Sequence, residues 1–157
     1  MKYKVIADLK GFVIFNTSGR VLCARPTEGH SGIVNGRPVG RPSLENDGRW
    51  VYLDNLERAC IWLRGWMNTQ PDKGHNDLII FTPSQWIVEH LSFTAPRPPK
   101  ARAHFLDGII RILDIINLMD TTFLIEKAQK DDATDKYVNR EDAVPPLVTA
   151  SSVFEGL

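Results

Sequence analysis

The sequence predicts an α/β fold in which a mixed five-stranded sheet carries helices on its faces. Three strand-like segments follow one another at the start of the chain, within residues 2–24, and consecutive strands of this kind form an antiparallel hairpin arrangement. Helix-like and strand-like segments then alternate up to Pro145 and Pro146, and this alternation favours parallel strand pairs. Both strand directions are therefore expected in one sheet.

The first half of the chain predicts three strands and then a long loop. Residues 2–8 form the first predicted strand, and residues 11–24 hold two apolar runs around Thr17-Ser18-Gly19-Arg20, which is typical of a hairpin turn. The composition of residues 26–49 changes to Gly, Pro and Arg, which indicates a loop insertion inside one domain spanning 1–157. Residues 50–53 fit either a short strand or the approach to a helix.

A helix is predicted over residues 55–67. Its apolar residues recur at helical spacing, and they are Leu56, Ala59, Cys60, Leu63 and Trp66. Asp54 followed three residues later by Glu57 is typical of a capping box, so the helix is expected to begin beside Asp54.

The second half of the chain predicts a strand that turns directly into a helix. The break falls at Pro83, and proline is tolerated in the first turn of a helix, where its missing N–H would have no partner. The predicted elements are a buried interior strand over 78–82, helices over 84–91 and 103–118, a strand over 121–125, a helix over 135–144 and a tail over 145–157.

Composition is that of a soluble globular protein. The chain has 157 residues, of which 43% are hydrophobic and 24% charged. It has no apolar run of the roughly 18 residues that a membrane span needs, and we expect no signal peptide. The expected location is the cytoplasm, which includes the nucleoid or the cytoplasm of a host cell. No membrane partner is expected. Cys23 and Cys60 lack metal-type spacing and are predicted to be buried thiols.

The charges are unevenly distributed although the net charge is zero. Residues 1–50 hold eight Lys or Arg and four Asp or Glu, and residues 93–104 hold Arg97, Lys100 and Arg102 without an acid. Arg37 and Arg41 each lie in a Gly-Arg-Pro unit, which fits either an arm entering a DNA minor groove or a solvated loop. Any polyanion would therefore be contacted by particular segments.

Four segments resemble the ribonuclease H family. The most specific is Ile80-Phe81-Thr82-Pro83-Ser84-Gln85-Trp86-Ile87-Val88, which is similar to the family's fourth strand and following helix. The start of the family's first helix is similar to residues 55–59, its first strand to residues 5–11, and the turn into its last helix to residues 135–139. The resemblance implies a ribonuclease H-like fold over nearly the whole chain.

The family's chemistry uses carboxylates that hold two divalent cations. Carried over by position, the resemblance implies that Asp8 and Glu57 keep a carboxylate, whereas Pro83 and Asn139 stand where the family has aspartates. The predicted nuclease centre is therefore degenerate, with vestigial Asp8 and Glu57 as weak metal ligands at most. No cofactor is expected, and Mg²⁺ or Mn²⁺ would be needed if the protein is active.

The sequence leaves other roles open for these acids. Asp8 also fits a polar strand end, and Glu57 also fits a helix cap. Asp131 and Asp132 fit either replacement metal ligands or a solvated loop. Without a metal, a metal-site carboxylate contributes repulsion, so we expect Asp8→Asn to leave stability unchanged or to raise it.

The sequence thus predicts a pseudoenzyme that binds nucleic acid, as an RNA–DNA hybrid or another duplex, or that serves as an interaction module. The resemblance places Arg97, Lys100 and Arg102 where some family members carry a basic protrusion that contacts the duplex backbone. The first alternative is an active divalent-metal nuclease of the ribonuclease H type. The second is a purely protein-binding module of viral or mobile-element origin.

Overall fold

The computed structural model describes residues 1–27, 33–34, 37–38, 49–71, 74–92 and 103–138. The elements in chain order are β1 (Lys2–Ala7), β2 (Gly11–Phe15), β3 (Val21–Pro26), β4 (Ile33–Val34), β5 (Arg37–Pro38), α1 (Arg49–Thr69), β6 (Asn76–Thr82), α2 (Gln85–Leu91), α3 (Ala103–Asn117), β7 (Thr121–Lys127) and α4 (Asp135–Val138).

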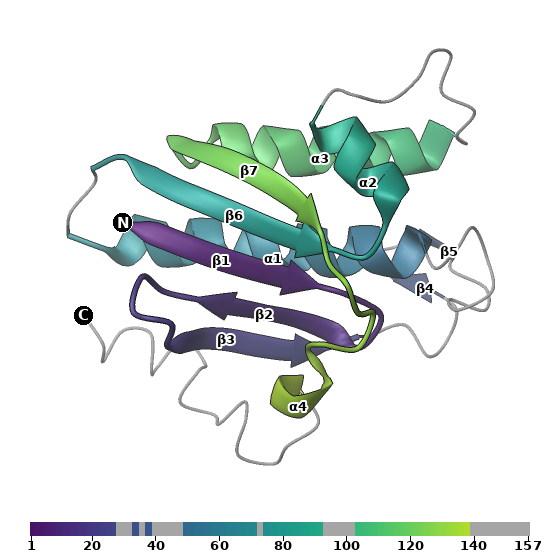
Figure 1. The fold of residues 1–157 in the computed structure, drawn as a ribbon. Helices are drawn as coiled ribbons and strands as arrows, with labels where there is room; N and C mark the ends of the chain where they lie inside the picture. The colour runs from purple at the N-terminus through teal and green to yellow at the C-terminus, as the bar shows by residue number, and fades with distance from the viewer. Residues whose placement is uncertain (28–32, 35–36, 39–48, 72–73, 93–102, 139–157) are drawn as a thin grey trace.

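Within these residues, five strands form one mixed sheet in the order β3-β2-β1-β6-β7 (Figure 1). β1 pairs antiparallel with β2 and parallel with β6, and β6 pairs parallel with β7. Val5 lies opposite Ile80, which lies opposite Ile125. The predicted α/β class, the mixed five-stranded sheet and the interior position of β6 are confirmed.

The β2–β3 hairpin is stabilised by local polar contacts and by glycine. Asn16 Oδ1 accepts hydrogen bonds from the N–H groups of Ser18 and Arg20, and Gly19 has a φ of 83°, which favours a residue without a side chain. At the other end of β2, a Cβ on Gly11 would lie 2.1 Å from the carbonyl oxygen of Arg25. A side chain at Gly11 would therefore separate β2 from β3.

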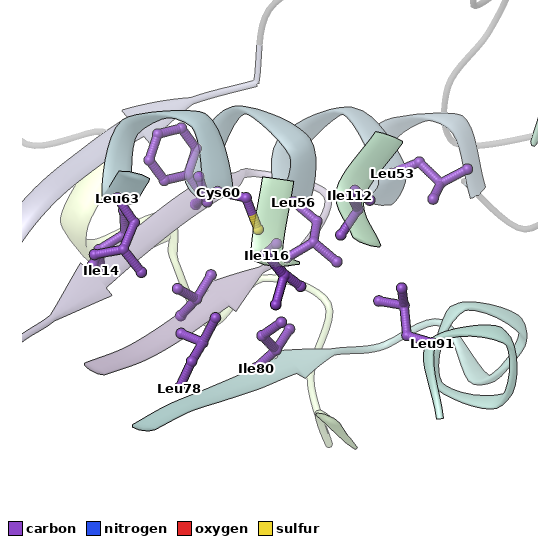
Figure 2. Close-up of a cluster of buried hydrophobic side chains, with 14 of the residues drawn as sticks. Ile14, Leu53, Leu56, Cys60, Leu63, Leu78, Ile80, Leu91, Ile112 and Ile116 are labelled. Carbon is purple, nitrogen blue, oxygen red and sulfur yellow. The ribbon is translucent and has the colours of Figure 1, made fainter. Parts of the chain in front are cut away.

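The main core lies between one face of the sheet and the helices α1 and α3 (Figure 2). Leu56, Cys60 and Leu63 of α1 pack against Ile14 of β2 and Ile80 of β6, in accord with the helical spacing found in the sequence. Ile112 and Ile116 of α3 complete this layer. Burying these apolar side chains is the main favourable contribution to folding.

The opposite face of the sheet is covered only in part by the described residues. The short helix α4 packs there over β2 and β3, where Val138 joins Val13 and Ala24 in a second small core. Along β6, the side chains alternate between the two faces, and Ile79 and Phe81 on this second face are half-buried. The expectation that the apolar side chains of β6 are buried on both faces is therefore wrong.

The helix α1 begins at Arg49, six residues before the predicted start. Val51, Tyr52 and Leu53 are buried in the main core, so the residues before Asp54 form the first turn of the helix and pack with the rest of it. Asp54 and Glu57 lie in the helix interior, and the predicted capping box is wrong. Residues 50–53 belong to the helix and not to a strand, so of the two predictions for this segment the one that led into the helix is nearer to what is observed.

The strand-to-helix break after β6 depends on Ser84. The Ser84 side chain accepts a hydrogen bond from the N–H of Ile87, and this serine is the N-cap of α2. Pro83 therefore precedes the cap, which corrects the expectation that it occupies the first helical turn. The residue still suits its place because its ring fixes φ where the chain leaves the strand.

The remaining predictions about organisation fall partly outside the described residues. The segment 26–49 includes the paired strands β4 and β5 and the start of α1, while residues 139–144 of the last predicted helix and the tail 145–157 lie outside. Cys23 and Cys60 are buried and form no disulfide, as predicted. Among the described helices, none has the length and apolar character to cross a membrane.

Candidate functional site

The carboxyl ends of the parallel strands β1, β6 and β7 meet at one edge of the sheet (Figure 1). In α/β sheets, ligand sites form beyond this edge, where loops rather than strands shape the surface. The structure has a hollow of about 470 Å³ here, lined by Tyr52, Pro83 and residues 127–132. This edge hollow is the place where the resemblance predicts a nuclease centre.

Asp8, at the end of β1, is completely buried beside this edge. Its Oδ1 atom accepts hydrogen bonds from the N–H groups of Lys10 (2.9 Å) and Gly11 (3.3 Å) and from the Thr134 hydroxyl (2.5 Å). Its Oδ2 atom accepts one from the Thr134 N–H (2.9 Å). The carboxylate thus joins the β1–β2 turn to the segment before α4, which lies 126 residues further along the chain.

The backbone around Asp8 is held by a second set of polar contacts. Asn55 of α1 donates its amide to the carbonyl oxygen of Asp8 at 2.7 Å and to the Thr27 hydroxyl at 2.8 Å. Thr27 in turn donates to the Leu9 carbonyl, and the Leu9 N–H donates to the Asp131 carbonyl. These bonds satisfy backbone groups at the end of β1 that no neighbouring strand pairs.

The environment of Asp8 raises the pKa of its carboxyl above the ordinary value. The main cause is burial, which disfavours the charged form. The hydrogen bonds from Thr134, Lys10 and Gly11 lower the pKa and offset part of this effect. Burial and hydrogen bonding therefore oppose each other at this residue, and burial is the larger effect.

Glu57 of α1 contacts the helix α3. Its Oε1 atom forms an ion pair with Nε of Arg111 on α3, at 3.1 Å, and Glu57 is only 7% exposed. Asn55, two residues earlier on α1, faces the end of β1, and two residues correspond to about 200° of helical rotation. The ion pair thus joins α1 to α3, and the Glu57 carboxylate is bound to Arg111.

The end of β6 contributes Pro83, whose side chain has no atom that can ligate a metal. The exposed Asp131 and Asp132 line the same hollow from the segment after β7. Among the residues that the structure describes, no three His, Cys, Asp or Glu side chains gather as a group that could hold a metal ion. The edge hollow therefore brings together Pro83 and two acids, and the backbone of Asp131 is hydrogen-bonded to Leu9, the residue after the buried Asp8.

Several predicted site residues lie outside the described part of the chain. They are Arg41, Arg97, Lys100, Arg102 and Asn139, and Arg37 is placed only as part of the strand β5. Thr134 and Asn55, which hydrogen-bond Asp8, are not among the site residues predicted from the sequence. Nothing near either residue in the sequence indicates this role, because the contacts join segments far apart along the chain.

No protein-family model matches the sequence, and no curated protein matches it either. Solved structures do match. Ribonuclease H1 from the halophilic archaeon Halobacterium salinarum NRC-1 is 13% identical, with a TM-score of 0.58 over 88% of this chain and 92% of that one. The chain therefore has a ribonuclease H-like fold.

Two further structures support this ribonuclease H-like assignment. The N-terminal ribonuclease H domain of Rv2228c from Mycobacterium tuberculosis is 13% identical, with a TM-score of 0.57 over 89% of this chain and 95% of that one. The LC11 ribonuclease H1, solved in complex with an RNA/DNA hybrid, is 16% identical, with a TM-score of 0.58 over 87% and 94%. At these identities the likeness establishes the ribonuclease H-like fold, and activity has to be argued from the site.

Proposed function

We propose that this ribonuclease H-like protein binds nucleic acid without cleaving it. The absence of cleavage is proposed because of the surroundings of Asp8. Its carboxylate is buried and accepts four hydrogen bonds from the protein itself. In this arrangement the Asp8 side chain joins the end of β1 to Thr134.

The described residues do not fit a pair of divalent cations. A two-metal centre needs several carboxylates that converge on the ions, with oxygens free to coordinate them. Asp8 is closed off by hydrogen bonds, Glu57 is paired with Arg111, and Pro83 offers no ligand. These features support a degenerate nuclease centre, as the resemblance implied, and we derive no catalytic step for this site.

Nucleic acid as the partner is supported by the fold and by the charge distribution. A solved protein with the same fold, LC11 ribonuclease H1, binds an RNA/DNA hybrid. The sequence carries Arg97, Lys100 and Arg102 in a segment without acids, where phosphate contacts would position a duplex without reading its bases. A fold that keeps its binding surface after losing its metal ligands would still hold nucleic acid.

The test is a binding titration with a fluorescently labelled RNA–DNA hybrid, followed by anisotropy at several salt concentrations. We expect binding that weakens with salt, and the combined change Arg97→Gln, Lys100→Gln and Arg102→Gln should reduce the salt slope by roughly two to three units. Absence of hybrid binding at low salt would contradict the proposal and favour a protein-binding module.

A second candidate, a nuclease that uses replacement acids, is favoured by one observation. Asp131 and Asp132 are exposed and line the edge hollow together with Pro83. In this alternative they would supply the carboxylates that the ends of β6 and α1 do not. A cleavage assay separates the two candidates, since only the alternative predicts metal-dependent hydrolysis.

A further inference from the structure

The second face of the sheet carries a basic groove that the resemblance does not assign. It has a volume of about 480 Å³ and lies between the β1–β2 part of the sheet and the segment of α4. Among the described residues, its lining includes Lys2 and Lys4 of β1 and Lys136 of α4 and holds no aspartate or glutamate. We call this site the sheet-face groove, and it lies on the opposite side of the sheet from α1.

The three lysines are exposed, and Lys2 lies opposite Asp77 in the register of β1 and β6. Lys2 and Lys4 project from the same face of β1, about 7 Å apart, because alternate residues of a strand share a face. Within the described part of the chain, no ion pair involves any of the three lysines. An anion in the groove would therefore lie among exposed lysine side chains.

Aromatic rings lie among these amines. Phe15 and Tyr137 pack edge to face with ring centroids 5.4 Å apart, and both line the groove. The Lys4 amine lies 5.4 Å from the ring centroid of Phe15 and 5.3 Å from that of Phe81. All three rings are half-buried, and the Lys136 amine lies 5.1 Å from the centroid of the Tyr137 ring. A base that stacks on Phe15 or Tyr137 would therefore take the place of a lysine amine, which could then contact the phosphates.

Apolar side chains border the groove on the second face of β6 and β7, in a hollow that Asp77 also lines. Ile79 lies beside Lys4 in the register of β1 and β6, and Leu124 lies beside Ile79 in the register of β6 and β7. Leu124 is 65% exposed. An exposed apolar surface that borders a basic groove is typical of a binding site. The charges and rings of the groove indicate which class of ligand would bind.

We propose that the sheet-face groove binds single-stranded nucleic acid. Proteins that hold single strands combine a positively charged groove with aromatic rings on which bases stack, and Lys2, Lys4 and Lys136 with Phe15 and Tyr137 supply both. A duplex keeps its base faces stacked inside and could use only the lysines. This inference rests on the proposed nucleic-acid-binding function and names a surface for it that is separate from the edge hollow.

The test measures binding of a labelled oligothymidine, which forms no duplex with itself, by fluorescence anisotropy over a salt series. The variant Lys4→Gln with Lys136→Gln should reduce the salt slope by roughly 1.4 units, which corresponds to two contacts on a single strand. Tyr137→Leu, which keeps an apolar side chain, should weaken binding roughly five- to 150-fold through lost stacking. The matched control is Lys10→Gln with Arg64→Gln, two exposed cations away from the groove.

Each outcome separates this inference from the proposed function. Weaker oligothymidine binding in the groove variants with normal binding in the control supports the inference. Binding of the RNA–DNA hybrid without oligothymidine binding, or equal oligothymidine affinity in the groove variants and the wild type, overturns the inference and leaves the proposed function standing. If neither nucleic acid binds, the proposed function fails as well. Thermal melts of each variant verify that it is folded.

Discussion

Asp8 illustrates at the scale of one residue how a position typical of a metal ligand can serve the fold. Its carboxylate accepts four hydrogen bonds in a fully buried site. The hydrogen bonds reverse the expectation that Asp8→Asn would leave stability unchanged. An asparagine has an amide NH₂ in place of one oxygen, and in either orientation that group faces an N–H donor.

We therefore predict that Asp8→Asn lowers the free energy of unfolding by about 1–3 kcal/mol at neutral pH, the cost of leaving buried polar groups unpaired. Urea denaturation monitored by tryptophan fluorescence measures it. The matched control is Asp132→Asn, an exposed acid at the edge hollow, which should change stability by less than about 0.5 kcal/mol. Unchanged or increased stability in Asp8→Asn would contradict the structural role of the carboxylate.

The raised pKa of Asp8 also predicts a pH dependence. Because its folded-state pKa exceeds the unfolded value of about 3.9, the folded protein holds this proton to higher pH than the unfolded chain. The resulting stability is fully present below about pH 4 and is lost as pH rises through the folded pKa. The stability difference between wild type and Asp8→Asn should thus be largest in acid and shrink toward neutral pH.

Unfolding curves of both proteins from pH 3 to 7 measure this difference. Because the two proteins differ only at residue 8, the contribution of the other carboxylates to the pH dependence is common to both and drops out. A difference that instead grows as pH rises from about 4 would mean that the hydrogen bonds outweigh burial at Asp8.

At the scale of elements, the strand β6 shows how the two faces of the sheet differ. Ile80 is completely buried against the α1 side, whereas Phe81 on the open face is half-buried beside Lys4. We predict that Ile80→Ala lowers the free energy of unfolding by about 2–5 kcal/mol, because it leaves a cavity in the main core.

Phe81→Ala is the matched comparison on the same strand, and it should cost clearly less than Ile80→Ala because its ring is already partly solvated. Thermal and urea denaturation measure both variants. A larger loss for Phe81→Ala would mean that something covers the open face in solution and would weaken the case for the sheet-face groove.

Several elements could be predicted from the sequence because their signals are local. The strand β6, the helix that follows it and the apolar spacing of Leu56, Cys60 and Leu63 each depend on neighbouring residues. The start of α1 could not, because Val51 and Leu53 are apolar residues whose burial in the core extends the helix beyond the expected cap. Tertiary packing overrides local propensity there.

The site was harder to predict because its contacts are distant along the chain. The resemblance pointed to Asp8 and Pro83, which follow the neighbouring strands β1 and β6, but it implied nothing about Thr134, which hydrogen-bonds both oxygens of Asp8. The partner of Glu57 is Arg111, which lies 54 residues away on another helix. The sheet-face groove likewise forms only when α4 packs back over the strands.

At the scale of the whole molecule, the fold resembles that of nucleases, whereas the candidate site lacks the free carboxylates that a two-metal nuclease centre needs. The strand order and the solved structures establish a ribonuclease H-like fold. The hydrogen bonds of Asp8, the ion pair of Glu57 and the position of Pro83 are the basis of our proposal that the protein does not cleave nucleic acid. A fold can keep its geometry after its chemistry has changed, because activity depends on a few side chains.

The most direct test of this central claim is a cleavage assay with a labelled RNA–DNA hybrid in Mg²⁺ and, separately, in Mn²⁺. Wild type, Asp8→Asn and the double variant Asp131→Asn with Asp132→Asn are compared at equal protein concentration. We predict that all three leave the hybrid intact to the level of a protein-free control. Metal-dependent cleavage by the wild type that disappears in Asp8→Asn or in the double variant would contradict the account.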